Sequence, residues 1–224
     1  MLLLSWNAAG WSGVHYDICK RYGSLKAYLD HLDVDVLCIQ ETKARHRDLS
    51  ESLNYYGQTC PGFDSYWSCF QPNNSMRGSN SAAGGRTTTQ QDSKASLHLS
   101  QTSNVSIQGK RKRSLKVKGG YAGVAIWVRS GNTLAACDRF LLLDPKTQTL
   151  IVDHDFDCEG RFLVVETRTF FIFNVYVPNG SSPYKKQFLY KLRQTMAACS
   201  MASQSKKGTV LCGDLNLVYR CRDV

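Results

Sequence analysis

The chain has 224 residues, of which 42% are hydrophobic, 21% are charged and 11% are aromatic, as is typical of one large globular domain or two small ones. This composition excludes a wholly disordered or coiled-coil chain, and no stretch approaches the run of about 18 apolar residues that a membrane-spanning helix needs. We therefore expect no membrane partner, whereas the net charge of +10 favours a polyanionic partner such as nucleic acid.

Nine cysteines are scattered through the sequence, at positions 19, 38, 60, 69, 137, 158, 199, 212 and 221. Their number is odd, no Cys-x-x-Cys pair occurs, and the sequence opens without a signal peptide. This pattern favours a reducing compartment, the cytosol or the nucleus, in which the cysteines serve as small buried apolar residues.

Three elements are predicted in the first part of the chain. Residues 2–5 are mostly apolar and predict a short strand. Ser24 is a favourable N-cap, and the apolar residues after it recur at helical spacing, which predicts a helix over 25–32. Residues 34–40 are mostly apolar, as in a strand that is buried on both faces.

The segment from about residue 72 to residue 118 interrupts this pattern. It is rich in Ser, Thr, Asn, Gln and Gly. It contains nine Lys and Arg residues but only one acidic residue, Asp92, so that it holds +8 of the net charge of +10. A segment of low hydrophobicity and high net charge cannot bury enough surface to offset the entropy of ordering it. We therefore predict a disordered basic insertion.

Further elements are predicted beyond this insertion. Residues 122–129 predict another buried strand, and residues 161–167 and 169–177 predict an antiparallel pair. Ser182 and Pro183 are suited to the N-cap and first position of a helix. The apolar face of this helix consists of Phe188, Leu192, Thr195 and Cys199.

A last strand is predicted at residues 208–214. The strands are thus paired as hairpins and interleaved with helices, which indicates an α/β sandwich rather than a purely parallel sheet. Because strand-like sequence continues on both sides of the insertion, we expect one domain over 1–224 that is interrupted at about 72–118.

Polar side chains follow several of the predicted strands at the point where each strand ends. They are Asn7, Glu41, Tyr176, Asn179, Asp214 and Asn216. Oxygen donors without sulfur suit Mg²⁺ or Mn²⁺ rather than zinc. Each residue alone has an ordinary explanation, since a Glu after a strand is commonly a solvated end or a helix cap, and an Asp-Leu-Asn sequence is commonly a turn.

Six motifs occur in a fixed order: SWN at 5–7, CIQETK at 38–43, GYAGVA at 120–125, EGR at 159–161, NVYVPN at 174–179 and GDLN at 213–216. Together they resemble the endonuclease/exonuclease/phosphatase superfamily, specifically its exonuclease III-type abasic-site (AP) endonucleases, and most closely the second eukaryotic type. QETK, EGR and NVYVPN separate this branch from the inositol phosphatases and sphingomyelinases. The resemblance implies a four-layer α/β sandwich.

The resemblance also implies roles for the strand-end residues. Glu41 is the main metal carboxylate, with Asn7 beside it, and the implied cofactor is Mg²⁺, with Mn²⁺ as the alternative. Asp214 activates or positions the attacking water and Asn216 orients the phosphate or Asp214, and both belong to the implied metal site as well. Tyr176 contacts the scissile phosphate.

Three further residues are implied to bind DNA. Asn179 helps to hold the DNA backbone, Lys43 belongs to the QETK motif, and Tyr121 lies in a segment that faces DNA in the family. The alternative for Tyr121 is an aromatic side chain that packs on the sheet. The basic run Lys110, Arg111, Lys112 and Arg113 is a candidate nuclear-localisation signal or a non-specific DNA contact, and the alternative is that it has no specific role.

Two departures from the family pattern stand out. Ala9 occupies a position that is acidic in some members, so one contact around the metal is absent or supplied differently. The sequence stops at Val224, shortly after GDLN, without the later aspartate and the Ser-Asp-His element of the family, and the five histidines occupy none of the motif positions. We therefore expect an N-terminal fragment whose fold is incomplete at the C-terminus.

The resemblance thus implies a nuclear DNA-repair enzyme. It performs Mg²⁺-dependent hydrolysis of the DNA backbone at abasic sites, with 3′-exonuclease or 3′-phosphodiesterase activity, in base-excision repair. Its expected partner is double-stranded DNA with abasic sites or 3′ ends. The alternative is a catalytically inactive, truncated relative that binds DNA non-specifically. A retroelement-type endonuclease shares the fold but seldom combines QETK with EGR.

Overall fold

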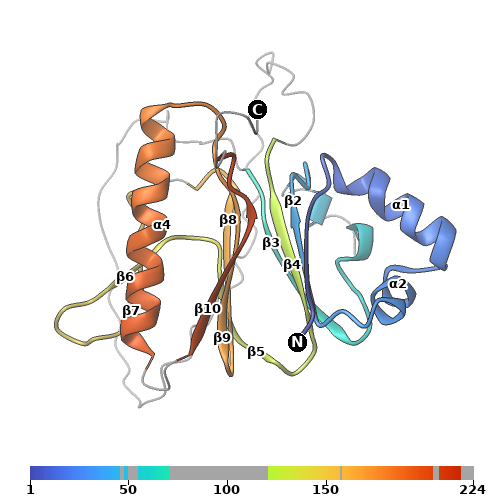
Figure 1. Ribbon diagram of the computed structural model, residues 1–224, viewed down its shortest axis with the longest axis horizontal. Coiled ribbons are helices and arrows are strands. Elements are labelled where there is room, and N and C mark those ends of the chain that lie inside the picture. Colours follow the sequence, from blue (N-terminus) through green and yellow to red (C-terminus); the bar gives the residue numbers. More distant parts are fainter. Residues whose placement is uncertain (46–47, 50–54, 71–120, 157, 204–206, 218–224) are drawn as a thin grey trace, which may run out of the picture.

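The computed structural model describes residues 1–45, 48–49, 55–70, 121–156, 158–203 and 207–217. Two four-stranded sheets lie face to face at the centre of the molecule (Figure 1). Helices α1 (Trp11–Tyr22) and α2 (Leu25–His31) cover the outer face of one sheet, and α4 (Pro183–Ala202) covers the outer face of the other. The predicted four-layer α/β sandwich is confirmed.

The first sheet has the strand order β1-β2-β4-β3. Strand β1 (Leu3–Asn7) runs parallel to β2 (Val36–Gln40), and β4 (Val124–Arg129) is antiparallel both to β2 and to β3 (Phe63–Ser68). The predicted basic insertion at 72–118, including the run Lys110–Arg113, lies outside the described residues, between β3 and β4 in the sequence.

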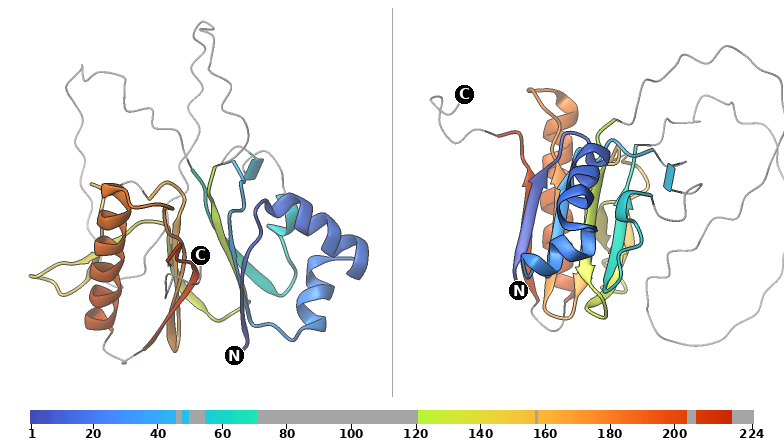
Figure 2. Two further views of the ribbon diagram at one scale, coloured as in Figure 1. Left: turned by 45° about the horizontal axis from the view of Figure 1, so that its top comes forward. Right: turned by 90° about the vertical axis from the view of Figure 1, so that its right-hand side faces the viewer.

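The second sheet has the order β10-β9-β8-β5. The predicted antiparallel pair forms β8 (Phe162–Thr167) and β9 (Phe170–Tyr176), and β10 (Gly208–Asp214) runs parallel to β9. Strand β5 (Thr133–Cys137) completes the sheet beside β8. Strands β1 and β10 are the outer strands of their sheets and lie along the same side of the sandwich (Figure 2).

The two predicted serine caps are present. The Ser24 hydroxyl accepts a hydrogen bond of 3.0 Å from the backbone amide of Ala27 at the start of α2. The Ser182 hydroxyl accepts one of 3.2 Å from the amide of Lys185, and a proline occupies the first turn of α4. Each cap satisfies an amide that would otherwise lack a partner in the first helical turn.

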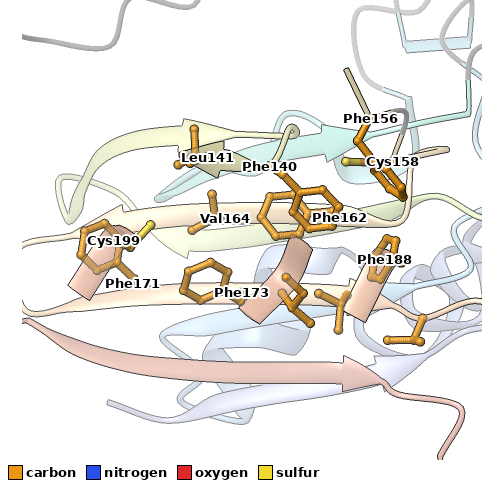
Figure 3. Packing of buried hydrophobic residues seen from close by; sticks show 13 residues of the cluster. Phe140, Leu141, Phe156, Cys158, Phe162, Val164, Phe171, Phe173, Phe188 and Cys199 are labelled. Atoms are coloured by element: carbon orange, nitrogen blue, oxygen red, sulfur yellow. The ribbon is translucent and has the colours of Figure 1, made fainter. Parts of the chain in front are cut away.

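Three apolar clusters hold the layers together. Trp11, Leu29 and Trp127 belong to the cluster under α1 and α2, and Val36, Ile126 and Ile172 belong to the cluster between the sheets. The third cluster packs α4 against the second sheet and against the hairpin of β6 (Leu141–Leu143) and β7 (Leu150–Val152). Figure 3 shows its aromatic members, Phe140, Phe156, Phe162, Phe171, Phe173 and Phe188. Because both faces of the central strands are covered, every residue of β2 is buried.

Two expectations from composition concern cysteines and membranes. No disulfide joins the eight cysteines within the described residues, and four of them, Cys38, Cys60, Cys158 and Cys199, are buried, as expected of small apolar residues. In the part of the chain that the structure describes, no helix combines the length and the apolar character that crossing a membrane requires.

Asp35 fixes the beginning of β1. Its carboxylate accepts hydrogen bonds from the Leu2 amide at 2.8 Å and from Arg129 Nε at 3.2 Å. The hydrogen bond from Leu2, together with Arg129 and the N-terminal charge, outweighs desolvation and holds the pKa of Asp35 below its ordinary value. The charged carboxylate therefore stabilises the fold.

Asp35→Asn is expected to lower the free energy of unfolding at neutral pH by less than about 1 kcal/mol, because the ion pair is open to solvent. Since folding lowers the pKa, this contribution is present above the ordinary value of 3.8 and is lost as the pH falls through the folded-state pKa. Urea unfolding of the parent and of Asp35→Asn at neutral and strongly acidic pH measures this contribution. A difference that persists at acidic pH would contradict the assignment.

Candidate active site

The polar strand ends meet at one end of the sandwich. Strands β1 and β2 run parallel and end at Asn7 and Gln40, while β9 and β10 run parallel and end at Tyr176 and Asp214. Because β1 and β10 lie side by side (Figure 2), the last residues of four strands from two sheets lie close together. The structure thus brings together Asn7, Glu41, Tyr176 and Asp214, which the sequence singled out.

Asn7 links two carboxylates at this place. Its Nδ2 donates to Glu41 Oε1 at 3.0 Å and to Asp214 Oδ2 at 2.8 Å. Its Oδ1 accepts a hydrogen bond of 3.0 Å from the Ala9 amide. Two carboxylates from different sheets therefore converge on one nitrogen atom, and the predicted metal ligand Asn7 contacts both of them.

Glu41 is held in its ionised form by its neighbours. Burial by itself raises the pKa of Glu41, but hydrogen bonds from Asn7, Tyr176 and Lys43 and the charge of Lys43 together lower it below its ordinary value. Burial, and then the hydrogen bond and charge of Glu41, raise the pKa of the Tyr176 hydroxyl, and Arg161 opposes this effect. At neutral pH the pair is thus a carboxylate and a protonated phenol, which donates the hydrogen bond.

Asp214 and Asn216 form a tight turn at the end of β10. The Asn216 amide donates to Asp214 Oδ1 at 2.9 Å, and Asn216 Nδ2 donates to the Val177 carbonyl at 2.7 Å. The buried Lys185 of α4 donates from Nζ to the Asn216 carbonyl at 2.7 Å. The prediction from sequence missed Lys185, because a lysine in the first turn of a helix is ordinarily exposed.

The backbone around these residues is unusual. Several residues other than glycine adopt positive φ angles near this end of the sandwich, among them Ala9 at 48°, Glu41 at 51°, Lys43 at 52°, Ala122 at 53° and Asn216 at 48°. Such conformations are costly and cluster at functional sites, where surrounding contacts enforce them. Here the amides of Thr42 and Lys43 donate to the carbonyls of Gly123 and Ala122 at 3.0 and 2.9 Å, which ties the CIQETK segment to the GYAGVA segment.

A buried polar network lies directly below the two carboxylates. Gln40 Nε2 donates to Asn174 Oδ1 at 2.7 Å, and Asn174 Nδ2 donates to the carbonyls of Ile39 at 3.0 Å and Ala125 at 2.9 Å. Asn174 is fully buried and connects β9 in one sheet with β2 and β4 in the other. Neither Gln40 nor Asn174 was predicted to have a role of its own.

The three predicted DNA-binding residues are exposed at this end of the molecule. Lys43 donates from Nζ to the Ala9 carbonyl at 2.9 Å and lies 3.4 Å from Glu41 Oε2. Asn179 follows β9. Tyr121 is 52% exposed, and the covered part of its ring contacts Phe70 and Arg161. Its hydroxyl accepts a hydrogen bond from Arg161.

A divalent cation fits this donor set, although the described residues contain no cluster of three or more His, Cys, Asp or Glu side chains. Mg²⁺ commonly takes one or two protein carboxylates, several waters and substrate phosphate oxygens rather than a complete protein cage. Glu41 and Asp214 provide two carboxylates that share a single hydrogen-bond donor. The donor set is therefore of the kind that such a cation takes from a protein.

Known proteins resemble this chain over most of its length. A model of the Endonuclease/Exonuclease/phosphatase family matches residues 4–224. Recombination repair protein 1 of Drosophila melanogaster is 23% identical over 218 residues, which are 97% of this chain and 22% of that protein. DNA-(apurinic or apyrimidinic site) endonuclease 2 of Xenopus laevis is 26% identical over 231 residues, which cover 100% of this chain and 37% of that protein.

Among solved structures, an AP endonuclease from Archaeoglobus fulgidus is similar with a TM-score of 0.49 and 20% identity. That match covers 100% of this chain and 61% of the archaeal one. The chain spans 22% and 37% of the lengths of the two curated relatives.

Proposed function

The chain belongs to the endonuclease/exonuclease/phosphatase family, and from this we propose that it hydrolyses the DNA backbone at abasic sites in DNA repair. The family match and the two relatives confirm the predicted resemblance to exonuclease III-type AP endonucleases. One observation carries the proposal: Asn7 holds two carboxylates from different sheets at a strand end that also presents a tyrosine hydroxyl.

Asp214 is proposed as the base of the reaction. Its Oδ1 accepts from the Asn216 amide and its Oδ2 accepts from Asn7, so the carboxylate is held in one orientation. In hydrolysis, a water oxygen bonds to phosphorus, Asp214 accepts the proton of that water, and the bond from phosphorus to the 3′ oxygen breaks. The leaving 3′ oxygen takes a proton from solvent and ends as a 3′ hydroxyl next to the abasic site, and Asp214 returns its proton to solvent. The same steps at a blocked 3′ end give 3′-phosphodiesterase or 3′-exonuclease activity.

Glu41 and Asp214 are proposed to hold Mg²⁺, with Mn²⁺ as the alternative, and Asn7 and Asn216 complete the predicted metal site. A bound divalent cation supplies positive charge to the phosphate oxygens as negative charge develops on them. Asn7 keeps the two carboxylates at a fixed separation. Tyr176, whose hydroxyl lies close to Glu41, is proposed to contact the scissile phosphate.

Double-stranded DNA with abasic sites or 3′ ends is the proposed partner. Lys43, Asn179 and Tyr121 are exposed beside the carboxylates and are proposed to contact its backbone. Nuclear localisation is proposed from the basic run at 110–113, which lies outside the described residues, and from the repair function.

The purified chain is expected to cut a duplex that carries one abasic-site analogue immediately 5′ to the lesion, in a reaction that requires Mg²⁺ and stops when EDTA removes the metal. The two carboxylates need a counter-cation to accept an anionic phosphate. Strands labelled at either end and resolved on a denaturing gel locate the cut, and an undamaged duplex is the control.

Two outcomes would contradict the proposal. Equal cutting of the lesion-containing and undamaged duplexes would remove the abasic specificity. Binding of both duplexes without any cutting would favour the alternative, a catalytically inactive relative that binds DNA non-specifically.

A further inference from the structure

Arg161 brings a positive charge into the interior beside the candidate active site. Its side chain is only 4% exposed, and its Nε lies 3.2 Å from Glu159 Oε2. A buried guanidinium is costly unless its donors are satisfied. We therefore expect the groups that satisfy the donors of Arg161 to be held in place by it.

The guanidinium of Arg161 lies between two tyrosine rings. Its Cζ atom is 4.9 Å from the ring centre of Tyr121 and 4.8 Å from that of Tyr176. Nη2 donates to the Tyr121 hydroxyl, and Nη1 donates to the Tyr176 carbonyl at 3.3 Å. Stacking of a cation on an aromatic face adds to these hydrogen bonds. One side chain thus contacts Tyr176 at both its ring and its backbone.

These contacts determine where the hydroxyl of Tyr176 lies. The Tyr176 amide donates to the Arg161 carbonyl at 2.8 Å, which fixes the backbone. The ring rests on the guanidinium, and the hydroxyl lies close to the Glu41 carboxylate. Loss of the guanidinium would leave the ring without support on that face. The phenol would then move relative to Glu41.

The turn that precedes Arg161 explains why its side chain points inward. Glu159 and Gly160 both have positive φ, 50° and 68°. A Cβ on Gly160 would lie 2.4 Å from the Phe70 amide nitrogen, so only glycine fits. The EGR motif thus forms a tight turn that is packed against Phe70. The ring of Phe70 also meets Tyr121 edge-on, with ring centres 5.7 Å apart.

We propose that Arg161 is a positioning residue, which holds Tyr176 against Glu41 and links it to the exposed ring of Tyr121. The proposal rests on the phosphodiester hydrolysis proposed above. Arg161 itself is buried and does not touch substrate. A nucleic acid bound at this surface would contact Tyr121, and Tyr121 contacts the same guanidinium that contacts Tyr176.

Arg129 provides a matched control. It also stacks on an aromatic ring, that of Phe63 at 5.2 Å, and it bonds to Asp35 and to the Val34 carbonyl. Arg129 is the last residue of β4, and its partner Asp35 fixes the beginning of β1. The candidate active site lies at the opposite end of β1. Arg129→Gln therefore removes the same kinds of contact as Arg161→Gln without touching Tyr176.

Arg161→Gln is expected to lower kcat for abasic-site cleavage by about 10- to 100-fold, because a small misplacement of a reacting group has an effect of this size. KM should change by less than about threefold, since no contact with substrate is removed. Arg161→Lys, which keeps the charge, should recover part of the loss. Arg129→Gln should lower the melting temperature and leave kcat unchanged.

A substrate-free measurement separates this proposal from the proposed function. In protein labelled with 3-fluorotyrosine, the ¹⁹F resonance that disappears in Tyr176→Phe belongs to Tyr176. It should shift in Arg161→Gln and Arg161→Lys but not in Arg129→Gln. A shift in a chain that cuts no DNA would refute the function and support the positioning. An unmoved resonance, or equal kcat values in Arg161→Gln and the parent, would overturn the positioning.

Discussion

Asp214→Asn is expected to reduce the single-turnover rate of abasic-site cleavage by about 10²- to 10⁴-fold, the range that a general base contributes. Asparagine is close to aspartate in shape and can still accept the hydrogen bond from the Asn216 amide. It cannot take the proton from water, and it removes one of the two charges that would hold a cation. Rates measured with saturating enzyme report this chemical step directly.

Asp144→Asn is the matched control for this substitution. Asp144 lies in the loop between β6 and β7, and its Oδ1 accepts from the Lys146 amide two residues later at 2.8 Å, as Asp214 Oδ1 does from the Asn216 amide at 2.9 Å. The two substitutions therefore alter the same kind of turn at two different places. If both variants lose activity equally, the loss is not specific to the carboxylate at the candidate active site.

Asn174→Leu is expected to lower the free energy of unfolding by about 3 kcal/mol or more. Leucine is similar in volume, but it removes the hydrogen bonds that Asn174 donates to the buried carbonyls of Ile39 and Ala125. It also removes the shortest of the three hydrogen bonds that Gln40 Nε2 donates. Each unsatisfied buried group costs about 1–3 kcal/mol. Urea denaturation followed by circular dichroism measures the change.

Asn132→Leu serves as the comparison for Asn174→Leu. Asn132 is exposed and donates one hydrogen bond of 3.1 Å to the Arg129 carbonyl. Water can replace that bond, so the change should stay below about 1 kcal/mol. Similar losses in the two variants would mean that the buried network contributes nothing beyond an ordinary surface hydrogen bond.

Local sequence predicted those elements whose signals are local. The helix after Ser182 begins at Pro183 as expected, and the last strand has the predicted bounds Gly208–Asp214. Helix α1 was not predicted. Its buried residues are only Trp11 and Ile18, and Gly10, which precedes it, makes no side-chain cap. Too little apolar periodicity remains in such a helix to distinguish it from a loop.

The strand-end residues of the candidate site could be predicted from the sequence, but the residues that hold them in place could not. Strand ends and motif order singled out Glu41 and Asp214 before any contact was known. The contacts of Asn174 and Arg161 depend on how two sheets pack and on a turn with two positive φ angles. The NVYVPN and EGR motifs contain these residues but do not indicate what their side chains touch.

Because Asn7 and Glu41 belong to one sheet and Tyr176 and Asp214 to the other, the geometry of the site depends on the spacing between two layers. The apolar side chains that set this spacing, such as Ile126 and Ile172, are fully buried. Removing a methyl group there would let the layers approach each other and would bring the carboxylates closer. The separation of the two carboxylates is therefore set from the interior, by residues that touch neither of them.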